Sequence, residues 1–279
     1  MDWRQFIQKA LEEDIREGDH TSLACIQEGA SGRAQLHIKD EGILAGVELA
    51  QEIFLQLDPA IQQHILISDG SPVTRGQIAF ELLGNARAIL MGERLALNCM
   101  QRMSGIATLT REYVRKVEGT GTKILDTRKT TPLFRAAEKR AVQIGGGYNH
   151  RFGLFDMILI KDNHIDFAGG IAQAIHAVVK YQHAKQLNLK LEIEARSLKD
   201  VEVILATGHV DRIMLDNFTL DDTARAVAMI NHKTETEASG GVTLQSVRDI
   251  ASTGVDYISV GALTHSYRSL DLSLKAKIY

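Results

Sequence analysis

The sequence predicts an α/β protein in two parts, a small α+β unit followed by an α/β barrel. From residue 123 onward, six short apolar runs alternate with helical stretches, which is the pattern of parallel βα units. Each of these runs ends in a charged or glycine-rich element, and barrel enzymes build their active sites at such strand ends. No nucleotide-type GxGxxG pattern follows the first run, so a barrel is favoured over a doubly wound sheet.

The first hundred residues have the mixed pattern of a small α+β unit. Apolar residues recur at helical spacing over residues 3–11 and predict an amphipathic helix. Asn85 is placed to cap a long helix, and Ser104 with Gly105 interrupts its apolar pattern before a second helical segment ends near Glu118. Between these helices we expect strands over residues 34–38, 61–67 and 77–83, and a helix over residues 47–57.

The barrel elements follow in strict alternation. The six strands are expected over residues 124–125, 157–160, 189–193, 212–215, 235–238 and 257–260, with helices over residues 133–142, 171–186, 198–207, 220–230 and 244–252. Leu270, Leu272 and Leu274 then alternate with polar residues, so a last strand is expected to return to the first part. We therefore expect an N-terminal domain over residues 1–110, joined by residues 266–279, and a barrel domain over residues 111–265.

The composition is ordinary for a folded protein, with 44% hydrophobic and 24% charged residues and a formal net charge of −3. There is no long basic run outside one central stretch, so a nucleic-acid partner is not expected. No apolar run is long enough for a membrane span, and the charges near the N-terminus are interleaved, which is unlike an export signal. Cytoplasmic residence is the resulting expectation. Two cysteines are too few for a disulfide framework and lack metal-ligand spacing.

The central stretch, residues 123–162, carries eight cations and four anions in a chain that is negative as a whole. It also contains three consecutive glycines, residues 145–147, and His150. Basic side chains near a glycine run predict a pocket for a small, strongly anionic ligand. The alternative is a solvated basic helix face beside an ordinary loop. For His150, a hydrogen bond to a ligand carboxylate and a buried structural role are both open.

Lys161 ends one predicted strand and has two functional interpretations. A desolvated lysine at a barrel strand end could form a Schiff base, as in aldolases. A protonated lysine could instead bind phosphate or carboxylate as a point charge. The neighbouring Arg128, Lys129 and Arg151 favour anion binding. A lysine that simply faces water at the end of the strand is the structural alternative.

Glu194 and Asp216 end neighbouring strands, so their carboxylates are expected to converge in the barrel mouth. Beside an anionic ligand they suggest Mg²⁺ held partly through water and substrate phosphates. A general acid/base pair of the glycosidase kind is the other option, but the nearby cations argue against a neutral sugar. Each carboxylate could also merely pair with those cations. Glycine-bearing loops at residues 239–241 and 260–262 could bind phosphate through backbone N–H groups. Together these features favour transfer from a phosphorylated sugar.

Motifs along nearly the whole chain resemble those of the quinolinate phosphoribosyltransferase (nicotinate-nucleotide pyrophosphorylase) family. The motifs are GDHTS at 18–22, AGVE at 45–48, GERLALN at 92–98, DTRKTTP at 126–132, GGGYNHR at 145–151, LIKDNHI at 159–165, MLDN at 214–217, EASGG at 237–241 and GVDYISVGALTHS at 254–266. The resemblance implies an N-terminal α/β sandwich domain followed by an incomplete (open) α/β barrel. It also implies a homodimer in which one subunit's N-terminal domain covers the other's barrel mouth, while a higher oligomer such as a hexamer stays open.

The reaction implied by the resemblance is phosphoribosyl transfer from 5-phosphoribosyl-1-pyrophosphate to quinolinate, with Mg²⁺, in de novo NAD biosynthesis. Its products would be nicotinate mononucleotide, pyrophosphate and CO₂. Matched motif by motif, the substrate-binding residues would be Arg94, Thr127, Arg128, Lys129, His150, Arg151, Lys161, Glu194, Asp216, Ser239, Gly240, Gly241, Val260, Gly261 and Ala262. Lys129, Lys161, Glu194 and Asp216 would be catalytic. Glu194 and Asp216 would hold Mg²⁺, directly or through water, and Arg94 would enter from the partner subunit.

The chain departs from the family's usual sequence at two places. The family usually reads TPGLR where this chain has Leu133 and Phe134 after Pro132, a change expected to reshape a turn. The family commonly has arginine where this chain has Gln143, which is expected to remove one phosphate or carboxylate contact. Two other enzymes stay open as alternatives. One is a related phosphoribosyltransferase acting on another aromatic acid, as the family's molybdenum-operon paralogues do, and the other is a Schiff-base aldolase using Lys161.

Overall fold

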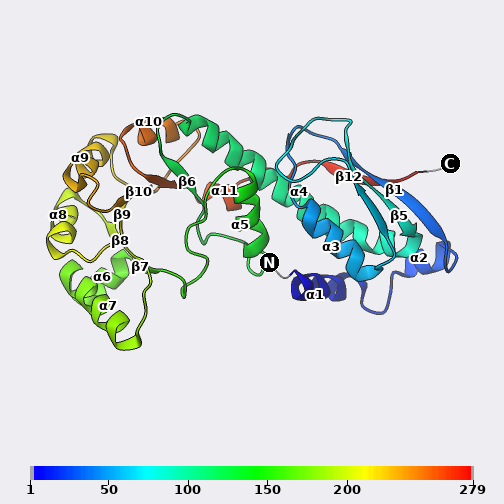
Figure 1. The fold of residues 1–279 in the computed structure, drawn as a ribbon, viewed down its shortest axis with the longest axis horizontal. Coiled ribbons are helices and arrows are strands. Elements are labelled where there is room, and N and C mark those ends of the chain that lie inside the picture. Colours follow the sequence, from blue (N-terminus) through cyan, green and yellow to red (C-terminus); the bar gives the residue numbers. More distant parts are fainter. Residues whose placement is uncertain (1–2, 278–279) are drawn as a thin grey trace. The chain divides into compact units, whose positions relative to one another are not determined.

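The computed structural model of the chain describes residues 3–277, and its internal contacts divide them into two units (Figure 1). The first unit runs up to Arg111 and also includes Thr131–Gly146 and the described residues from Ser266 on. The second unit comprises Glu112–Thr130 and Gly147–His265. Residues 131–146, which the sequence analysis placed in the barrel domain, thus group with the first unit.

The first unit is built around a four-stranded antiparallel sheet of order β12-β1-β5-β3. Its strands are β1 (Ser31–Ile38), β3 (Gln62–Ile65), β5 (Ile78–Asn85) and β12 (Leu272–Ala276), and a short pair is formed by β2 (Gly42–Ile43) and β4 (Pro72–Val73). Its helices are α1 (Arg4–Ile15), α2 (His20–Cys25), α3 (Val47–Leu57), most of α4 (Ala86–Val117) and α5 (Arg135–Ile144). Of the alternating leucines near the C-terminus, Leu272 and Leu274 lie in β12, with Leu274 paired opposite Leu36, whereas Leu270 precedes the strand.

The core of the first unit lies between this sheet and α3. Leu36 of β1 and Phe80 of β5 are buried, as are Ile53 and Phe54 of α3. The rings of Phe54 and Phe80 meet edge to face with centroids 6.4 Å apart, a favoured aromatic geometry. Apolar residues recur about every 3.6 residues in the helix and every second residue in the strands, so each element has one apolar face, and these faces pack together.

Helix α4 is continuous over 32 residues, so the predicted interruption at Ser104 and Gly105 is wrong. The two small residues serve close packing instead. The hydroxyl of Ser104 accepts from the backbone N–H of Ala45 at 2.9 Å and donates to its carbonyl at 3.1 Å. A Cβ on Gly105 would collide with the carbonyl oxygen of Arg268. The helix begins as predicted, because the Asn85 side chain accepts from the N–H of Ala88 at 3.1 Å.

The second unit contains a six-stranded parallel sheet of order β6-β11-β10-β9-β8-β7, which confirms the six predicted strands. The strands are β6 (Lys123–Leu125), β7 (Ile158–Ile160), β8 (Leu191–Ala195), β9 (Arg212–Asp216), β10 (Glu235–Ser239) and β11 (Tyr257–Ser259). The first two strands in sequence, β6 and β7, occupy opposite edges and do not pair. The barrel is therefore open between them, as the resemblance implied.

Helices lie along the outer side of the curved sheet (Figure 1). The long ones are α7 (Ile171–Lys185), α8 (Leu198–Thr207) and α9 (Leu220–Ile230), and the short ones are α6 (Asp162–Ala168), α10 (Val247–Ser252) and α11 (Ala262–His265). The short helices α2, α6 and α11 lie outside the elements expected from the sequence. Among the described residues, no helix has both the length and the hydrophobicity needed to cross a membrane.

Candidate active site

The carboxyl ends of the six parallel strands surround one cavity of about 810 Å³. Every residue that lines it belongs to the second unit. The lining residues are Thr127, Arg128, Lys129, His150, Arg151, Leu159, Lys161, Asp162, Glu194, Met214, Asp216, Asn217, Glu237, Ser239, Gly240, Gly241, Val242, Ser259, Val260, Gly261, Ala262 and His265. This is the position at which parallel barrels place their ligand sites.

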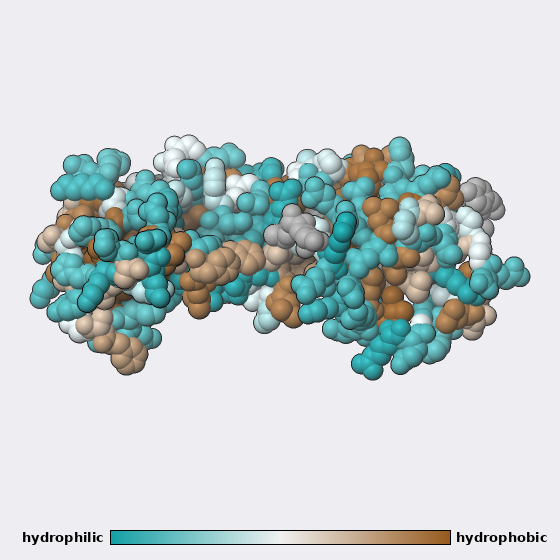
Figure 2. All heavy atoms as spheres, turned by 60° about the horizontal axis from the view of Figure 1, so that its bottom comes forward, coloured by the Kyte–Doolittle hydropathy of each residue, from teal (hydrophilic) through white to brown (hydrophobic). Residues whose placement is uncertain are grey.

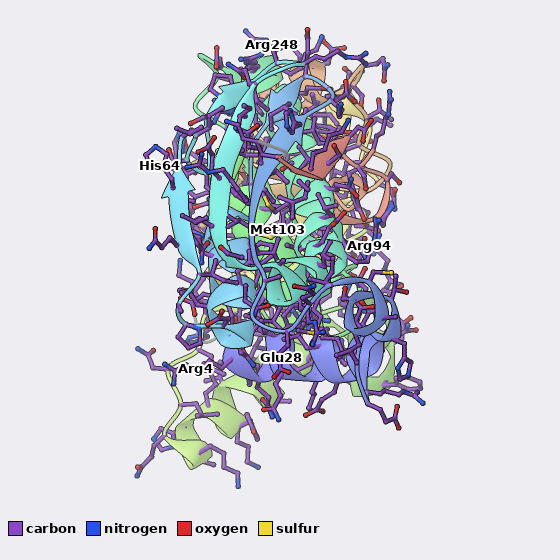
Figure 3. The ribbon with its side chains drawn as sticks, turned by 90° about the vertical axis from the view of Figure 1, so that its right-hand side faces the viewer. Arg4, Glu28, His64, Arg94, Met103 and Arg248 are labelled. Atoms are coloured by element: carbon purple, nitrogen blue, oxygen red, sulfur yellow. The ribbon has the colours of Figure 1, made fainter. Side chains whose placement is uncertain are left out.

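All but one of the residues proposed from the sequence line this cavity. The exception is Arg94, an exposed residue of α4 in the first unit (Figure 3). Gln143, one of the two departures from the family pattern, likewise lies in the first unit, near the end of α5. The described residues of a single chain thus assemble the cavity without either of them.

The segment that follows β6 brings three cations to the cavity. Lys129 is fixed at both backbone ends, because its N–H donates to the Thr127 hydroxyl at 3.0 Å and its carbonyl accepts from Thr264 at 2.9 Å. Arg128 and Arg151 both line the cavity, and the buried Nε of Arg128 has no hydrogen-bond partner among residues 3–277. Burial, followed by the charge of Arg128, lowers the pKa of Arg151. Two guanidinium groups that repel each other in a partly buried pocket favour an anion between them.

Lys161 forms an ion pair with Glu194 across neighbouring strands β7 and β8. The second oxygen of Glu194 accepts the backbone N–H of Asp162 at 3.1 Å, and the Glu194 side chain is only 8% exposed. A carboxylate partner suits a lysine that acts as a point charge toward anions. The geometry therefore favours the anion-binding interpretation of Lys161 over the Schiff-base interpretation.

Asp216 ends β9 and lies in the same cavity as Glu194. Burial, and then the charge of Glu194, raises the pKa of the Asp216 carboxyl, while Asn217 donates a hydrogen bond to it at 2.9 Å. A divalent cation at this point would relieve the repulsion between the two carboxylates. Because Glu194 already has Lys161 as its partner, the donor set suits Mg²⁺ better at Asp216 than at Glu194.

The loops after β10 and β11 close the far side of the cavity. Gly240 has a φ of 99°, and a Cβ there would collide with the side chain of Asn217. A Cβ on Gly261 would lie 3.1 Å from Cδ of Lys129. Both glycines therefore let the backbone approach the cavity closely, which suits phosphate binding by N–H groups.

The three glycines at residues 145–147 have a different role from the one the sequence suggested, and none of them lines the cavity. Gly145 is the C-cap of α5 and donates to the carbonyl of Ala141 at 2.9 Å. A Cβ on it would lie 2.6 Å from the carbonyl oxygen of Ala107 on α4. This glycine is therefore required for helix packing, and the ligand-facing glycines are those after β10 and β11.

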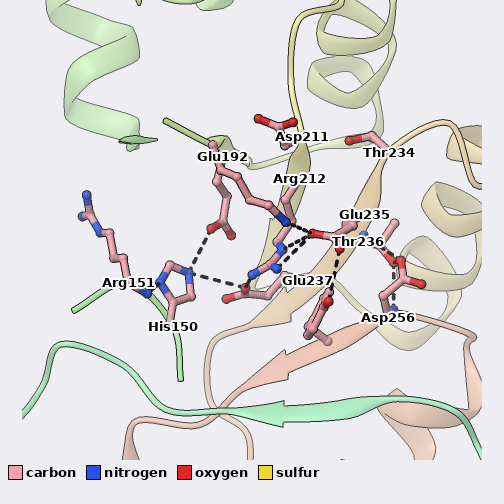
Figure 4. A network of polar contacts seen from close by, with 12 residues as sticks. His150, Arg151, Glu192, Asp211, Arg212, Thr234, Glu235, Thr236, Glu237 and Asp256 are labelled. Atoms are coloured by element: carbon pink, nitrogen blue, oxygen red, sulfur yellow. Dashed lines mark hydrogen bonds and ion pairs between the residues drawn. The ribbon is translucent and has the colours of Figure 1, made fainter. Parts of the chain in front are cut away.

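The barrel interior holds a buried polar cluster, which the sequence did not indicate as a unit (Figure 4), and two of its members, His150 and Glu237, also line the cavity. The Nε2 atom of His150 lies 2.9 Å from Glu192 and 3.5 Å from Glu237, both carboxylates having no exposed side-chain surface. Arg212 contacts Glu237 and Glu235 at 3.0 Å each. Burial, followed by the charge of Glu192, raises the pKa of Glu237 to about 7.

A sequence signal for this cluster was available. Glu192 and Glu194 are two residues apart on β8, and Glu235 and Glu237 are two apart on β10. Residues i and i+2 of a strand point to one face, so each pair places two carboxylates on the same side of the sheet. His150, Glu192 and Glu237 also bring ligand atoms within 4.8 Å of one another. Arg212 lies 3.0 Å from Glu237, however, and its positive charge would repel a metal ion there.

The open parallel barrel, with cations, carboxylates and phosphate-type loops at its strand ends, defines an enzyme for small anionic substrates. The pattern described as "Quinolinate phosphoribosyl transferase, N-terminal domain" matches residues 19–104, and the pattern for its C-terminal domain matches residues 106–275. The chain belongs to the quinolinate phosphoribosyltransferase family.

Named relatives support this membership. The chain is 45% identical to a probable nicotinate-nucleotide pyrophosphorylase (carboxylating) of Bacillus subtilis, over 94% of this chain and 89% of that one. It is also 45% identical to a chloroplastic nicotinate-nucleotide pyrophosphorylase of Arabidopsis thaliana, over 98% of this chain and 82% of that one. Among solved structures, the nicotinate-nucleotide pyrophosphorylase from Francisella tularensis matches with a TM-score of 0.91 and 42% identity, covering 98% of this chain and 95% of that chain.

Proposed function

We infer that this chain transfers the phosphoribosyl group of 5-phosphoribosyl-1-pyrophosphate to quinolinate and releases CO₂, giving nicotinate mononucleotide and pyrophosphate. The observation that carries this inference is the set of cations, Arg128, Lys129, Arg151 and Lys161, gathered at one cavity of the barrel. Quinolinate carries two carboxylates, which need several cations to replace their hydration. The names of the relatives point to the same reaction.

The cations divide between two substrates in this proposal. Arg128 and Arg151 present guanidinium groups to the carboxylates of quinolinate, since planar forks bind carboxylates in two-point fashion. Lys129 lies against the Gly261 loop, with its Cδ 3.1 Å from the position of a Cβ there, and serves the phosphates of the donor. Lys161 reaches the anionic substrates while still paired with Glu194.

The reaction needs no covalent enzyme intermediate. The bond between C1 of the ribose and the pyrophosphate oxygen breaks, and the oxygen keeps the electron pair. Positive charge that develops on the ribose is stabilised by the carboxylates of Glu194 and Asp216. The lone pair of the pyridine nitrogen then forms the new bond to C1. The positively charged ring accepts the electron pair released when the adjacent carboxylate leaves as CO₂, and that ring carbon takes a proton.

We also propose Mg²⁺ as the metal, held by Asp216, with Glu194 contributing directly or through water. The support is that both carboxylates line one cavity from neighbouring strands, where burial and then the charge of Glu194 raise the pKa of Asp216. When bound, Mg²⁺ would offset the charge of the departing pyrophosphate.

A homodimer in which Arg94 reaches the cavity of the partner is a further part of the proposal. Arg94 is exposed on α4, and it is the one proposed binding residue outside the cavity lining. The second unit also exposes large apolar side chains, with Leu154 at 70%, Phe155 at 72% and Phe167 at 92%. Hydrophobic residues come to the surface among hydrophilic ones in Figure 2. Exposed apolar side chains of this kind are what a partner subunit would cover. Residence in the cytoplasm stays a prediction.

A panel of pyridine acids tests the substrate assignment. Purified protein is incubated with the phosphoribosyl donor, with and without Mg²⁺, and with quinolinate, nicotinate or other pyridine carboxylates. We expect product only from quinolinate and only with the metal. Preference for another aromatic acid would support the related phosphoribosyltransferase instead. Trapping of a sugar phosphate on Lys161 by borohydride would support the aldolase.

A further inference from the structure

His150, for which the sequence left both a ligand contact and a structural role open, has protein partners on three sides. Its backbone N–H donates to the buried carboxylate of Asp126 at 2.8 Å. Its ring Nδ1 accepts the backbone N–H of Arg151 at 2.7 Å. Its Nε2 faces the interior carboxylates of Glu192, at 2.9 Å, and Glu237, at 3.5 Å. Both ring nitrogens are therefore turned to the protein, so the ring has no nitrogen left to aim at a substrate.

Both carboxylates that face this ring are buried, and Glu237 has a further charged partner. Glu237 is held by Arg212 at 3.0 Å, and Arg212 stacks on the ring of Tyr257 at 4.0 Å from its centroid. Glu192 has no exposed side-chain surface. Buried charged groups held by partners on neighbouring strands are rigid, which is the property that supporting groups of a binding site need.

On the ligand side, His150 is coupled to Arg151. The hydrogen bond from the Arg151 N–H to the imidazole fixes the direction in which the chain turns at this residue. The guanidinium of Arg151 lines the cavity and is steadied by a 3.4 Å contact from its Nη1 to the carbonyl of Met157. A rotated imidazole would release the backbone of Arg151 and so displace its guanidinium.

We propose that Glu192 and Glu237, the latter fixed by Arg212, are positioning residues that act through the imidazole of His150 to orient Arg151 toward a carboxylate of the aromatic diacid. The inference rests on the proposed function for the identity of that diacid. In this role both glutamates act through His150 and Arg151, although Glu237 also lines the cavity. The effect that passes through His150 falls on the acid half of the site, because Arg151 is the cavity cation bonded to that ring.

The chain offers a matched control on the same strand. Glu235 and Glu237 both lie on β10, and both contact Arg212 at 3.0 Å, but only Glu237 faces His150. Glu237→Gln and Glu235→Gln each remove one charged partner of Arg212. Glu192→Gln keeps both Arg212 contacts and serves as a second test should Glu237→Gln fold poorly.

The experiment measures KM for quinolinate, KM for the phosphoribosyl donor, kcat and Tm in each variant, with quinolinate affinity by calorimetry. Glu237→Gln and Glu192→Gln should raise KM and Kd for quinolinate by about tenfold or more, as expected for a weakened charge-assisted contact, and leave KM for the donor unchanged. Glu235→Gln should lower Tm but leave KM for quinolinate and KM for the donor unchanged. In a protein that already carries His150→Ala, Glu237→Gln should raise KM for quinolinate little further, because both changes act through the same imidazole.

Two results would overturn the positioning role. One is an equal rise of KM for quinolinate and KM for the donor in Glu237→Gln. The other is a double variant, Glu237→Gln with His150→Ala, whose KM for quinolinate rises by the product of the two single effects. Failure of the proposed function itself looks different: the unmodified protein would then neither bind nor turn over quinolinate.

Discussion

The guanidinium of Arg212, on β9, lies 3.0 Å from the carboxylate of Glu237, on β10. A second guanidinium nitrogen lies 3.0 Å from Glu235 of the same strand, and the guanidinium carbon lies 4.0 Å from the centre of the Tyr257 ring on β11. One side chain thus joins three adjacent strands inside an open barrel. A barrel that lacks closure between β6 and β7 gains from such a link, because it adds side-chain contacts to the backbone hydrogen bonds between these strands.

Replacement of Arg212 by methionine should destabilise the protein strongly. The change keeps the side chain long and apolar but leaves Glu237 as a buried carboxylate without its guanidinium partner. Breaking a buried ion pair in this way typically costs about 3–5 kcal/mol. Urea unfolding followed by circular dichroism measures it. A loss below about 1 kcal/mol would mean that the link contributes little to the fold.

Stability should depend on pH through Glu237. Its pKa in the folded protein is raised from the ordinary 4.5 to about 7, so the folded state binds more protons than the unfolded state between these values. The free energy of unfolding contributed by this group is therefore greatest at low pH and falls as pH rises from about 4.5 to about 7, by up to about 3 kcal/mol. Glu237→Gln should flatten this slope, measured by urea unfolding at several pH values. An unchanged slope would contradict the assignment.

Leu133 should be replaceable by glycine with a gain in stability. Leu133 has a φ of 64° and is 92% exposed, so it carries the strain of a left-handed residue and little packing. Glycine removes a backbone strain of about 1–2 kcal/mol. Its greater freedom in the unfolded chain offsets part of this, so the free energy of unfolding should rise by about 0.5–1 kcal/mol. Phe167, equally exposed but helical, is the control, since Phe167→Gly should lower stability. Equal losses at both sites would argue against strain at Leu133.

Lys161→Ala should lower kcat/KM about a hundredfold or more, the usual effect of removing a charge that stabilises the transition state. Lys161→Arg should retain more activity than Lys161→Ala because it keeps the charge. Lys190→Ala is the matched control, because this 63% exposed lysine pairs with Glu235 and does not line the cavity. Unchanged turnover in Lys161→Ala would remove this residue from the catalytic set.

The sequence predicted the barrel strands well because short apolar runs bounded by polar strand ends are local signals. It also predicted the cavity residues, since parallel strands bring their carboxyl ends to one edge. The error in α4 has a physical reason: Ser104 and Gly105 have low helix propensity, but close contacts to Ala45 and Arg268 favour small residues there. Helix propensity depends on the local sequence, so it does not predict contacts with residues far away in the chain.

Two further features depend on contacts between distant segments. Residues 131–146 join the first unit through the ion pair of Arg102 with Glu138 at 2.8 Å and the packing of Phe134 on Phe6 at 5.4 Å. The buried cluster around Arg212 was missed because the glutamates on β8 and β10 were assessed singly. Only the strand register shows that they share one interior with His150.

The most direct test of the central claim is the stoichiometry of the reaction. Purified protein is supplied with quinolinate, 5-phosphoribosyl-1-pyrophosphate and Mg²⁺, and nicotinate mononucleotide, pyrophosphate and CO₂ are each quantified. The account predicts the three products in equal amounts. Absence of nicotinate mononucleotide from folded protein, or its formation without CO₂, would contradict it.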